Sequence, residues 1–157
     1  MSIQDFWQAY LATLPADHPH HSASYSAEGF GDSPQMAEEL GQLIVQGVKT
    51  ATASLLWAYE AENAALPQVG SLCLVLDGQD QPLCLIETYE VSIHPYNEVG
   101  EQQAYEEGEG DRSLAYWRAA HWDFFTRACA SIGRTPIETM PIVCERFRVL
   151  YRAVTPA

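Results

Sequence analysis

Long hydrophobic runs, a secretion signal and cysteine motifs are all missing from this sequence. No apolar run among its 157 residues approaches the roughly 18–20 residues that a membrane-spanning helix needs. Residues 1–7 lack the basic start and apolar stretch of a secretion signal. The four cysteines match no zinc or CxxC pattern, so we predict that they are reduced and packed in the core. We therefore expect a cytoplasmic protein with no membrane partner.

Basic side chains are also scarce. Eight lysines and arginines stand against 21 acidic residues, and the formal net charge is −13. A protein that contacts many phosphates of a duplex is expected to be basic, so this composition argues against long duplex DNA and favours a small or single-stranded ligand. All seven arginines follow residue 111, and Lys49 is the only lysine and the only base in residues 1–111. A lone cation in so acidic a region must pair with acids or serve a specific role.

The length is that of one domain, and we predict a single domain over residues 1–157. Apolar spacing predicts a helix from Ser2 to Pro15, a second from Asp32 to Gly47 and a third over residues 111–132. Alternation of apolar and polar residues predicts strands over residues 49–54, 71–77, 83–92 and 142–151. A hairpin turn at 78–82 is predicted to join the second and third of these strands. Residues 15–29 are expected to be a loop, and residues 94–110 a loop or short helix. This order predicts an α+β fold with a small curled sheet or barrel.

Lys49 opens an alternation of hydroxyl and alanine residues, in which Thr50, Thr52 and Ser54 are predicted to share one face of a strand. As a cation, a lysine beside hydroxyls can hold a phosphate or polarise a carbonyl; if burial favours its neutral form, it can act as a base or nucleophile. It can equally be a surface lysine at a helix end. The glycine spacing is not that of a phosphate-binding P-loop. The local pattern leaves these alternatives open.

A second candidate segment is dense in acids and contains Glu106, Glu107, Gly108, Glu109, Gly110 and Asp111. The glycines permit backbone angles that other residues avoid, so the loop can present a carboxylate to a lysine or a metal. It can also be a solvated turn whose Asp111 favours the start of the next helix. Ser113 is a helix cap or a site hydroxyl, and His121 lies on the apolar face of the predicted helix, which favours a core position.

Two further candidates lie outside these segments. Asp32 follows Phe30 and Gly31 at a predicted helix start, where it can cap the helix or orient a site residue. Trp57 follows the Lys49 strand and can stack on a base or pack in the core.

Taken together, these segments resemble the ASCH family, named for the activating-signal-cointegrator homology domain. The resemblance covers roughly residues 25–150, with the N-terminal helix packed on that core, and the chain looks like the longer bacterial members. It rests on an ordered set of residues, namely Phe30-Gly31-Asp32, residues 47–54, Gly70, Ile86-Glu87-Thr88, residues 107–111, Ser113, Leu114, Trp117, Arg118 and His121. The resemblance implies a PUA-like fold, a small β-barrel flanked by helices, in an RNA or nucleotide context.

Some members resembling this chain cleave single-stranded RNA, and shorter members hydrolyse the amide of N4-acylated cytidine with a Lys, a Thr and a Glu. By motif these are Lys49, Thr52 and Glu109, with Glu107 and Glu106 as alternatives for the acid. We expect a hydrolase directed at RNA or nucleotides, with single-stranded RNA ranked first. The alternatives are an N4-acylcytidine amidohydrolase and a non-catalytic RNA- or nucleotide-binding module.

In the amidohydrolase mechanism, a neutral Lys49 activates Thr52 or a water and Glu109 protonates the leaving amine. In the ribonuclease mechanism, Lys49 neutralises the scissile phosphate. No metal ligand is assigned, although a divalent cation such as manganese would suit the ribonuclease mechanism. A regulatory or structural protein whose acidic surface meets a basic partner is a third class. The residues expected to contact the substrate are Asp32, Thr50, Ser54, Trp57, Ser113 and Arg118.

Overall fold

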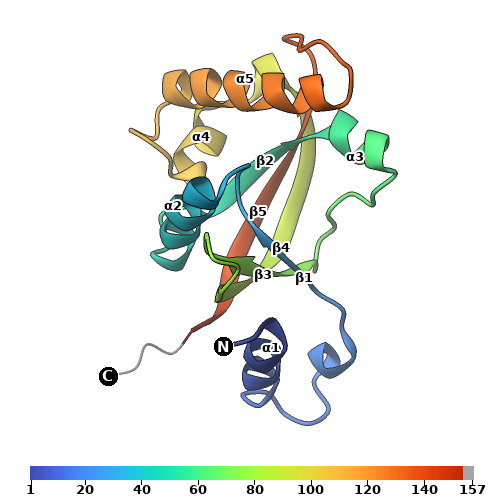
Figure 1. Cartoon of the computed structure of the whole chain (residues 1–157), viewed down its shortest axis with the longest axis vertical. Coiled ribbons are helices and arrows are strands. Elements are labelled where there is room, and N and C mark those ends of the chain that lie inside the picture. The colour runs from blue at the N-terminus through green and yellow to red at the C-terminus, as the bar shows by residue number, and fades with distance from the viewer. Residues whose placement is uncertain (154–157) are drawn as a thin grey trace. The chain divides into compact units, whose positions relative to one another are not determined.

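The computed structural model of the chain describes residues 1–153. Within these residues the chain forms five α-helices, two 3-10 helices and five strands (Figure 1). In chain order they are α1 (Ile3–Leu11), η1 (Pro19–Ser22), β1 (Ser26–Gly29), α2 (Pro34–Val45), β2 (Ala51–Leu55), α3 (Leu56–Glu62), β3 (Leu72–Leu76), β4 (Pro82–Pro95), η2 (Tyr96–Glu98), α4 (Glu101–Glu107), α5 (Leu114–Ser131) and β5 (Pro141–Arg152). None of these helices combines the length and the apolar character that crossing a lipid bilayer requires.

The five strands form one sheet in the order β1-β3-β4-β5-β2, with β1 and β2 at its edges. β3 and β4 form the predicted antiparallel hairpin, in which Asp77 Oδ1 accepts hydrogen bonds from the backbone N–H groups of Gln79 and Gln81 in the turn. β1 pairs in parallel with β3, and β2 pairs antiparallel with β5. The predicted α+β class is therefore confirmed.

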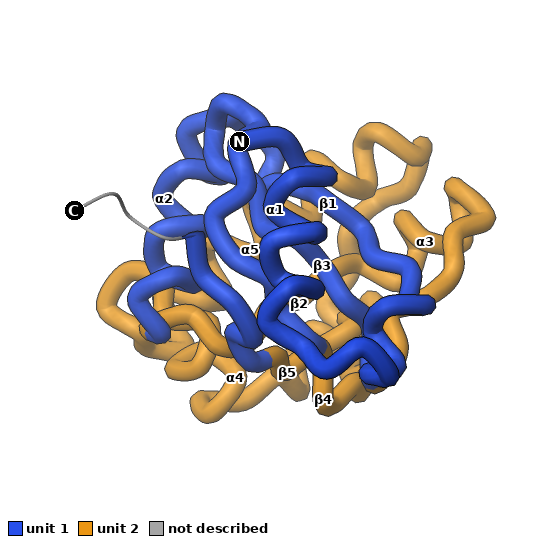
Figure 2. Tube along the Cα trace, turned by 90° about the horizontal axis from the view of Figure 1, so that it is seen from below, with its two compact units in different colours: residues 1–47, 70–87, 148–157 blue, residues 48–69, 88–147 orange. Residues whose placement is uncertain are grey.

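Residue contacts divide the chain into two compact units (Figure 2). Among the described residues, the first contains residues 1–47, 70–87 and 148–153. In this unit α1 begins at Ser2, whose side chain accepts a hydrogen bond from Asp5 N. The buried face of α1, which includes Phe6 and Trp7, packs against apolar residues of β3 and β4. α2 packs against β1 and β3 and begins at Ser33, with Pro34 in its first turn.

The second unit contains residues 48–69 and 88–147. Its core is centred on residues of α5, β5 and the segment before β5, with Phe125, Met140 and Ile142 fully buried. α3, α4 and α5 all contact β2. Because α4 and α5 both lie against β2, polar side chains at their junction meet the residues that lead into this strand. Lys49 and Thr50 are these residues.

Several element predictions need correction. The expected loop at 15–29 contains η1 and β1; β1 lacks an apolar alternation, and it is defined by its pairing with the distant strand β3. Residues 56–62 form α3, which was not predicted. The residue at its N-cap makes no side-chain hydrogen bond, so the sequence carries no capping signal there. Residues 94–110 contain η2 and α4, so the short-helix alternative is the correct one. α1 ends at Leu11 and not at Pro15, and α5 begins at Leu114 and not at 111.

The four cysteines are free, as predicted, and three of them are buried: Cys84, Cys129 and Cys144. Burial raises the pKa of Cys84 and of Cys144 to about 12, so these thiols stay protonated near neutral pH. The remaining thiol, Cys73, is half-buried. The buried cysteines therefore act as core residues and not as nucleophiles.

Candidate active site

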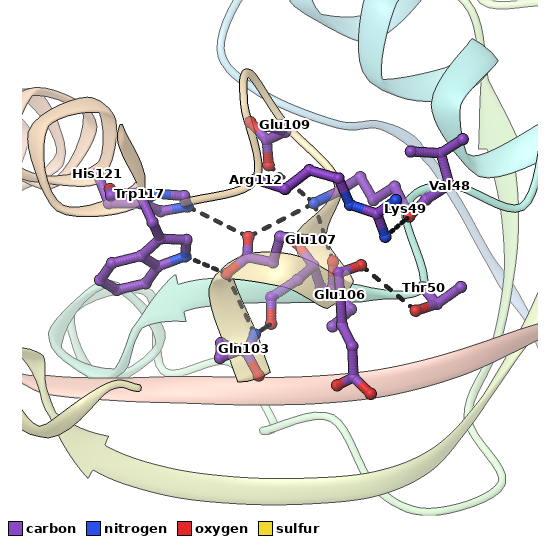
Figure 3. Close-up of polar contacts among 12 residues, drawn as sticks. Val48, Lys49, Thr50, Gln103, Glu106, Glu107, Glu109, Arg112, Trp117 and His121 are labelled. Atoms are coloured by element: carbon purple, nitrogen blue, oxygen red, sulfur yellow. Dashed lines mark hydrogen bonds and ion pairs between the residues drawn. The ribbon is translucent and has the colours of Figure 1, made fainter. Parts of the chain in front are cut away.

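Lys49 is buried immediately before β2, with 1% of its surface exposed. Its Nζ donates to the Ala51 carbonyl at 2.9 Å, to Glu109 Oε2 at 3.0 Å and to Glu107 Oε1 at 3.5 Å (Figure 3). An ammonium group has three N–H donors, so each donor of Lys49 meets an acceptor. Two of these acceptors are carboxylates, so opposite charges meet at the buried end of this side chain.

Four donors surround the carboxylate of Glu107, which is 1% exposed. Oε1 lies 3.5 Å from Lys49 Nζ and 3.2 Å from His121 Nε2, while Oε2 accepts hydrogen bonds from Gln103 Nε2 at 3.1 Å and from Trp117 Nε1. Burial by itself raises the pKa of Glu107. The charge of Lys49 and the bonds from His121 and Trp117 outweigh burial and lower that pKa to about 2. Glu107 is therefore an anion near neutral pH.

We expect acid to destabilise the protein partly through Glu107. Its pKa is lowered from 4.5 to about 2 on folding, so its stabilising contribution is present above about pH 4.5 and is lost as the pH falls toward 2. At about 1.4 kcal/mol per pKa unit, the contribution is about 3 kcal/mol. Urea unfolding of the wild type and of Glu107→Gln, each at neutral pH and at a pH of about 3, measures it. The wild type should lose more stability than the variant, and equal losses would contradict an ionised Glu107 in the folded state.

Glu109 forms the accessible edge of the cluster, with 19% of its side chain exposed. It lies on the connection 108–113, whose backbone is held against residues 48–50. Gly108 has a φ of 74°, and a Cβ there would lie 2.5 Å from the Val48 carbonyl oxygen, so a side chain does not fit. Arg112 donates to the same Val48 oxygen at 3.4 Å. These contacts position the backbone on both sides of Glu109, and within residues 1–153 its carboxylate is bonded to Lys49 alone.

The structure distinguishes the carboxylates of the acidic segment by whether they contact Lys49. Both Glu107 and Glu109 contact Lys49, so the choice of Glu109 and the alternative Glu107 are both brought to the cluster. Glu106 points elsewhere: its Oε2 accepts a hydrogen bond from Arg146 Nε at 2.7 Å. Figure 3 shows the carboxylate of Glu106 directed away from the Lys49 ammonium.

The predicted hydroxyl residues have different surroundings. The backbone N–H of Thr50 donates to the Glu106 carbonyl at 2.7 Å and its hydroxyl donates to the same oxygen at 3.3 Å, so Thr50 joins α4 to the start of β2. Thr52 contributes its carbonyl oxygen, which accepts a hydrogen bond from Gln103 at 3.1 Å. The hydroxyl of Ser54 lies 2.9 Å from that of Tyr59. The Thr52 hydroxyl is not among the three acceptors of Lys49, and its catalytic role stays a prediction.

The other predicted contact residues are bonded outside the cluster. The ring of Trp57 packs on the core, and the guanidinium carbon of Arg134 lies 3.9 Å from its centroid. The Ser113 hydroxyl caps α5 by accepting from Tyr116 N, and Arg118 donates to the carbonyls of residues 97 and 99. Asp32 belongs to the first unit, where it lines a cavity of about 310 Å³. Substrate contact by these four residues remains a prediction.

Three cluster residues were not predicted as site residues: Gln103, Trp117 and His121, although Trp117 and His121 belong to the residues that carry the family resemblance. Both ring nitrogens of His121 face acceptors, Nδ1 the Trp117 carbonyl at 2.9 Å and Nε2 the Glu107 carboxylate. His121 is buried, as expected for a core position, but its polar contacts were not expected. One signal was available: Gln103 and Glu107 on α4, and Trp117 and His121 on α5, are each four residues apart and so share a helix face.

The cluster also tests whether a divalent cation fits. Glu107, Glu109 and His121 each offer one ligand atom, and these atoms lie within 4.8 Å of one another. However, the Lys49 ammonium already bonds both carboxylates, and Gln103 and Trp117 occupy the second oxygen of Glu107. A divalent cation would have to displace the Lys49 ammonium group from these carboxylates. The arrangement therefore fits the lysine side chain and does not fit a bound metal ion.

The fold places the chain among the PUA-like α+β proteins. A family model for the ASCH domain matches residues 26–151, and the chain belongs to that family. This agrees with the resemblance expected over residues 25–150. ASCH domains are in general associated with RNA binding.

Solved structures of the same family are close to this one. The ASCH domain of Lactobacillus crispatus is 38% identical, with 95% of this chain and 94% of that chain covered at a TM-score of 0.90. Protein EF3133 of Enterococcus faecalis is also 38% identical, with 96% and 88% covered at a TM-score of 0.84. No curated protein matches the chain.

Proposed function

We propose that this ASCH domain is a hydrolase that acts on nucleosides or RNA at the Lys49 cluster, and that its reaction is the hydrolysis of an amide on an acylated cytosine. The observation that carries the proposal is a buried ammonium group with three acceptors, of which only Glu109 is an accessible side chain. Burying such a charged cluster is costly, and costs of this kind are commonly retained at functional sites.

In this proposal Lys49 acts as a cation, as in the predicted ribonuclease mechanism, and not as the base of the predicted amidohydrolase mechanism, because its Nζ is bonded to two carboxylates. Rotation of the Glu109 carboxylate frees one N–H of Lys49, while Ala51 and Glu107 continue to hold the ammonium in place. A carbonyl oxygen of the substrate then accepts a hydrogen bond from the freed N–H. A preorganised cation at that position stabilises negative charge as it develops on the oxygen.

The proposed reaction needs only Glu109, Lys49 and one water molecule. Glu109 takes a proton from a water molecule, and the water oxygen attacks the carbonyl carbon of the acyl group. The resulting negative oxygen is bonded to Lys49. When the C–N4 bond breaks, Glu109 returns the proton to N4, and the products are a carboxylic acid and the unacylated cytosine.

Charge favours an amide over a phosphodiester as the reacting group. The single positive charge of Lys49 is already shared between Glu107 and Glu109, and Glu107 is held as an anion. A phosphodiester would add a negative charge beside these two carboxylates, whereas an amide is neutral. The acidic chain, with its net charge of −13, repels a phosphate backbone in the same way.

Incubating the protein with N4-acetylcytidine, and separately with a labelled single-stranded RNA with and without manganese, tests the proposal. We expect release of acetate and cytidine, with the RNA intact. Cleavage of the RNA with N4-acetylcytidine unchanged would overturn the amide assignment and support the ribonuclease alternative. Binding without any product would indicate a non-catalytic module.

A further inference from the structure

Exposed aromatic side chains lie on both sides of the connection that carries Glu109. Tyr105, near the end of α4, is 55% exposed, and Tyr116, in the first turn of α5, is 43% exposed. Both rings therefore present aromatic surface to solvent on either side of Glu109 in the sequence. Both rings belong to the second unit, as do Lys49 and Glu109.

The connection holds these rings in place. The guanidinium carbon of Arg112 lies 3.7 Å from the centroid of the Tyr105 ring, and Arg112 Nε donates to the Tyr105 carbonyl at 2.9 Å. On the other side, Gly110 has a φ of 59°, and a Cβ there would lie 2.5 Å from ring atoms of Tyr116, so that ring packs directly on the glycine. Glu109 stands between Tyr105 and Tyr116 in the sequence and directly precedes Gly110.

From this arrangement we propose that Tyr105, Arg112 and Tyr116 form a stacking platform for the nucleobase of the substrate. Planar rings and a guanidinium group are the surfaces on which bases stack, and stacking requires no particular base edge. Arg112 N donates to the Glu109 carbonyl at 3.0 Å, so the platform adjoins the accessible edge of the cluster. In the proposed orientation, a base held there places its exocyclic group toward Lys49. This inference rests on the proposed reaction for its orientation, but not for the binding itself.

The charges of the residues around the platform, here called the rim, indicate whether the bound nucleobase belongs to a free nucleoside or to an RNA strand. Glu109 and Asp111 lie on the same connection as Arg112, so the rim carries more negative than positive charge. The stacking energy of a base is available to a free nucleoside and to a strand alike, but only the strand brings phosphates near these acids. The occupant is therefore a neutral nucleoside rather than a stretch of RNA.

Binding of cytidine and of N4-acetylcytidine to ring variants tests the platform independently of catalysis. Tyr116→Ala and Tyr105→Ala should each raise the dissociation constant by roughly 5- to 150-fold, the range that corresponds to stacking of one base. Tyr116→Phe and Tyr105→Phe keep the ring and should bind as the wild type does. Trp122→Ala, which removes an exposed ring elsewhere on α5, is the matched control, with thermal unfolding checked for every variant.

The outcomes separate this inference from the proposed function. Wild-type affinity in both alanine variants, or equal losses in the alanine and phenylalanine variants, would overturn the platform. Ring-dependent binding of nucleosides without any hydrolysis would leave the platform standing and remove the amidohydrolase. A short single-stranded oligocytidine is the second ligand: if it binds in a ring-dependent manner and the nucleoside does not, the nucleoside assignment is wrong.

Discussion

Replacing Lys49 with methionine is expected to destabilise the folded protein by about 3–5 kcal/mol, the usual cost of breaking a buried ion pair on one side. The substitution leaves Glu107 buried with its strongest counter-charge removed, although Gln103, Trp117 and His121 still donate to it. The flexible thioether fills much of the volume of the lysine stem, so loss of packing adds little. Urea unfolding of the two proteins at neutral pH measures the difference.

A second variant distinguishes charge from packing. The double variant Lys49→Met/Glu107→Gln removes both buried charges, and we expect it to recover much of the lost stability, because a neutral buried pair carries no unpaired charge. Arg127→Met is the surface control: it breaks the exposed pair with Asp123 on α5, and such pairs contribute at most about 1 kcal/mol. A loss for Lys49→Met no larger than that of Arg127→Met would show that the buried pair does not stabilise the fold.

The parts of the fold that local sequence signals define were predicted well. α2 has a cap at Ser33, Pro34 in its first turn and Gly47 after its end at a φ of 78°, and each of these signals is local. The β3–β4 hairpin likewise follows from two apolar runs and a polar turn. β1 and α3 could not be found in this way. The four residues of β1 become a strand through their pairing with β3, and the seven residues of α3 follow β2 directly without a side-chain cap.

The candidate site was predicted in part, for a comparable reason. Lys49 was singled out because it is the only base in residues 1–111, whereas Glu109 was chosen through the resemblance to the ASCH family, with Glu107 and Glu106 as alternatives. Which carboxylates reach Lys49 depends on where α4 ends. The αL conformation of Gly108 ends α4 just after Glu107, leaving Glu107 inside the helix and Glu109 on the following connection. His121 was expected in the core because the apolar face of α5 is also the face that meets Glu107.

Glu109→Gln is expected to lower kcat/KM for N4-acetylcytidine on the order of 10²–10⁴-fold, the usual contribution of a general acid–base group. Glutamine keeps the shape of the side chain and can still accept a hydrogen bond from Lys49 Nζ, but it cannot take a proton from water. Because Glu109 is partly exposed and its carboxylate is bonded to Lys49 alone within the described residues, stability should change little. Steady-state kinetics and thermal unfolding of the same preparations measure both effects.

Glu101→Gln is the matched control, because it makes the same charge change on exposed α4 surface. It should leave kcat/KM near the wild-type value, which excludes a general effect of reducing the negative charge. If Glu109→Gln retains full activity, the proton transfer assigned to Glu109 is wrong. If both variants lose activity equally, the loss follows from net charge and not from the carboxylate beside Lys49. A loss confined to Glu109→Gln connects the reaction to the one accessible acceptor of the buried ammonium group.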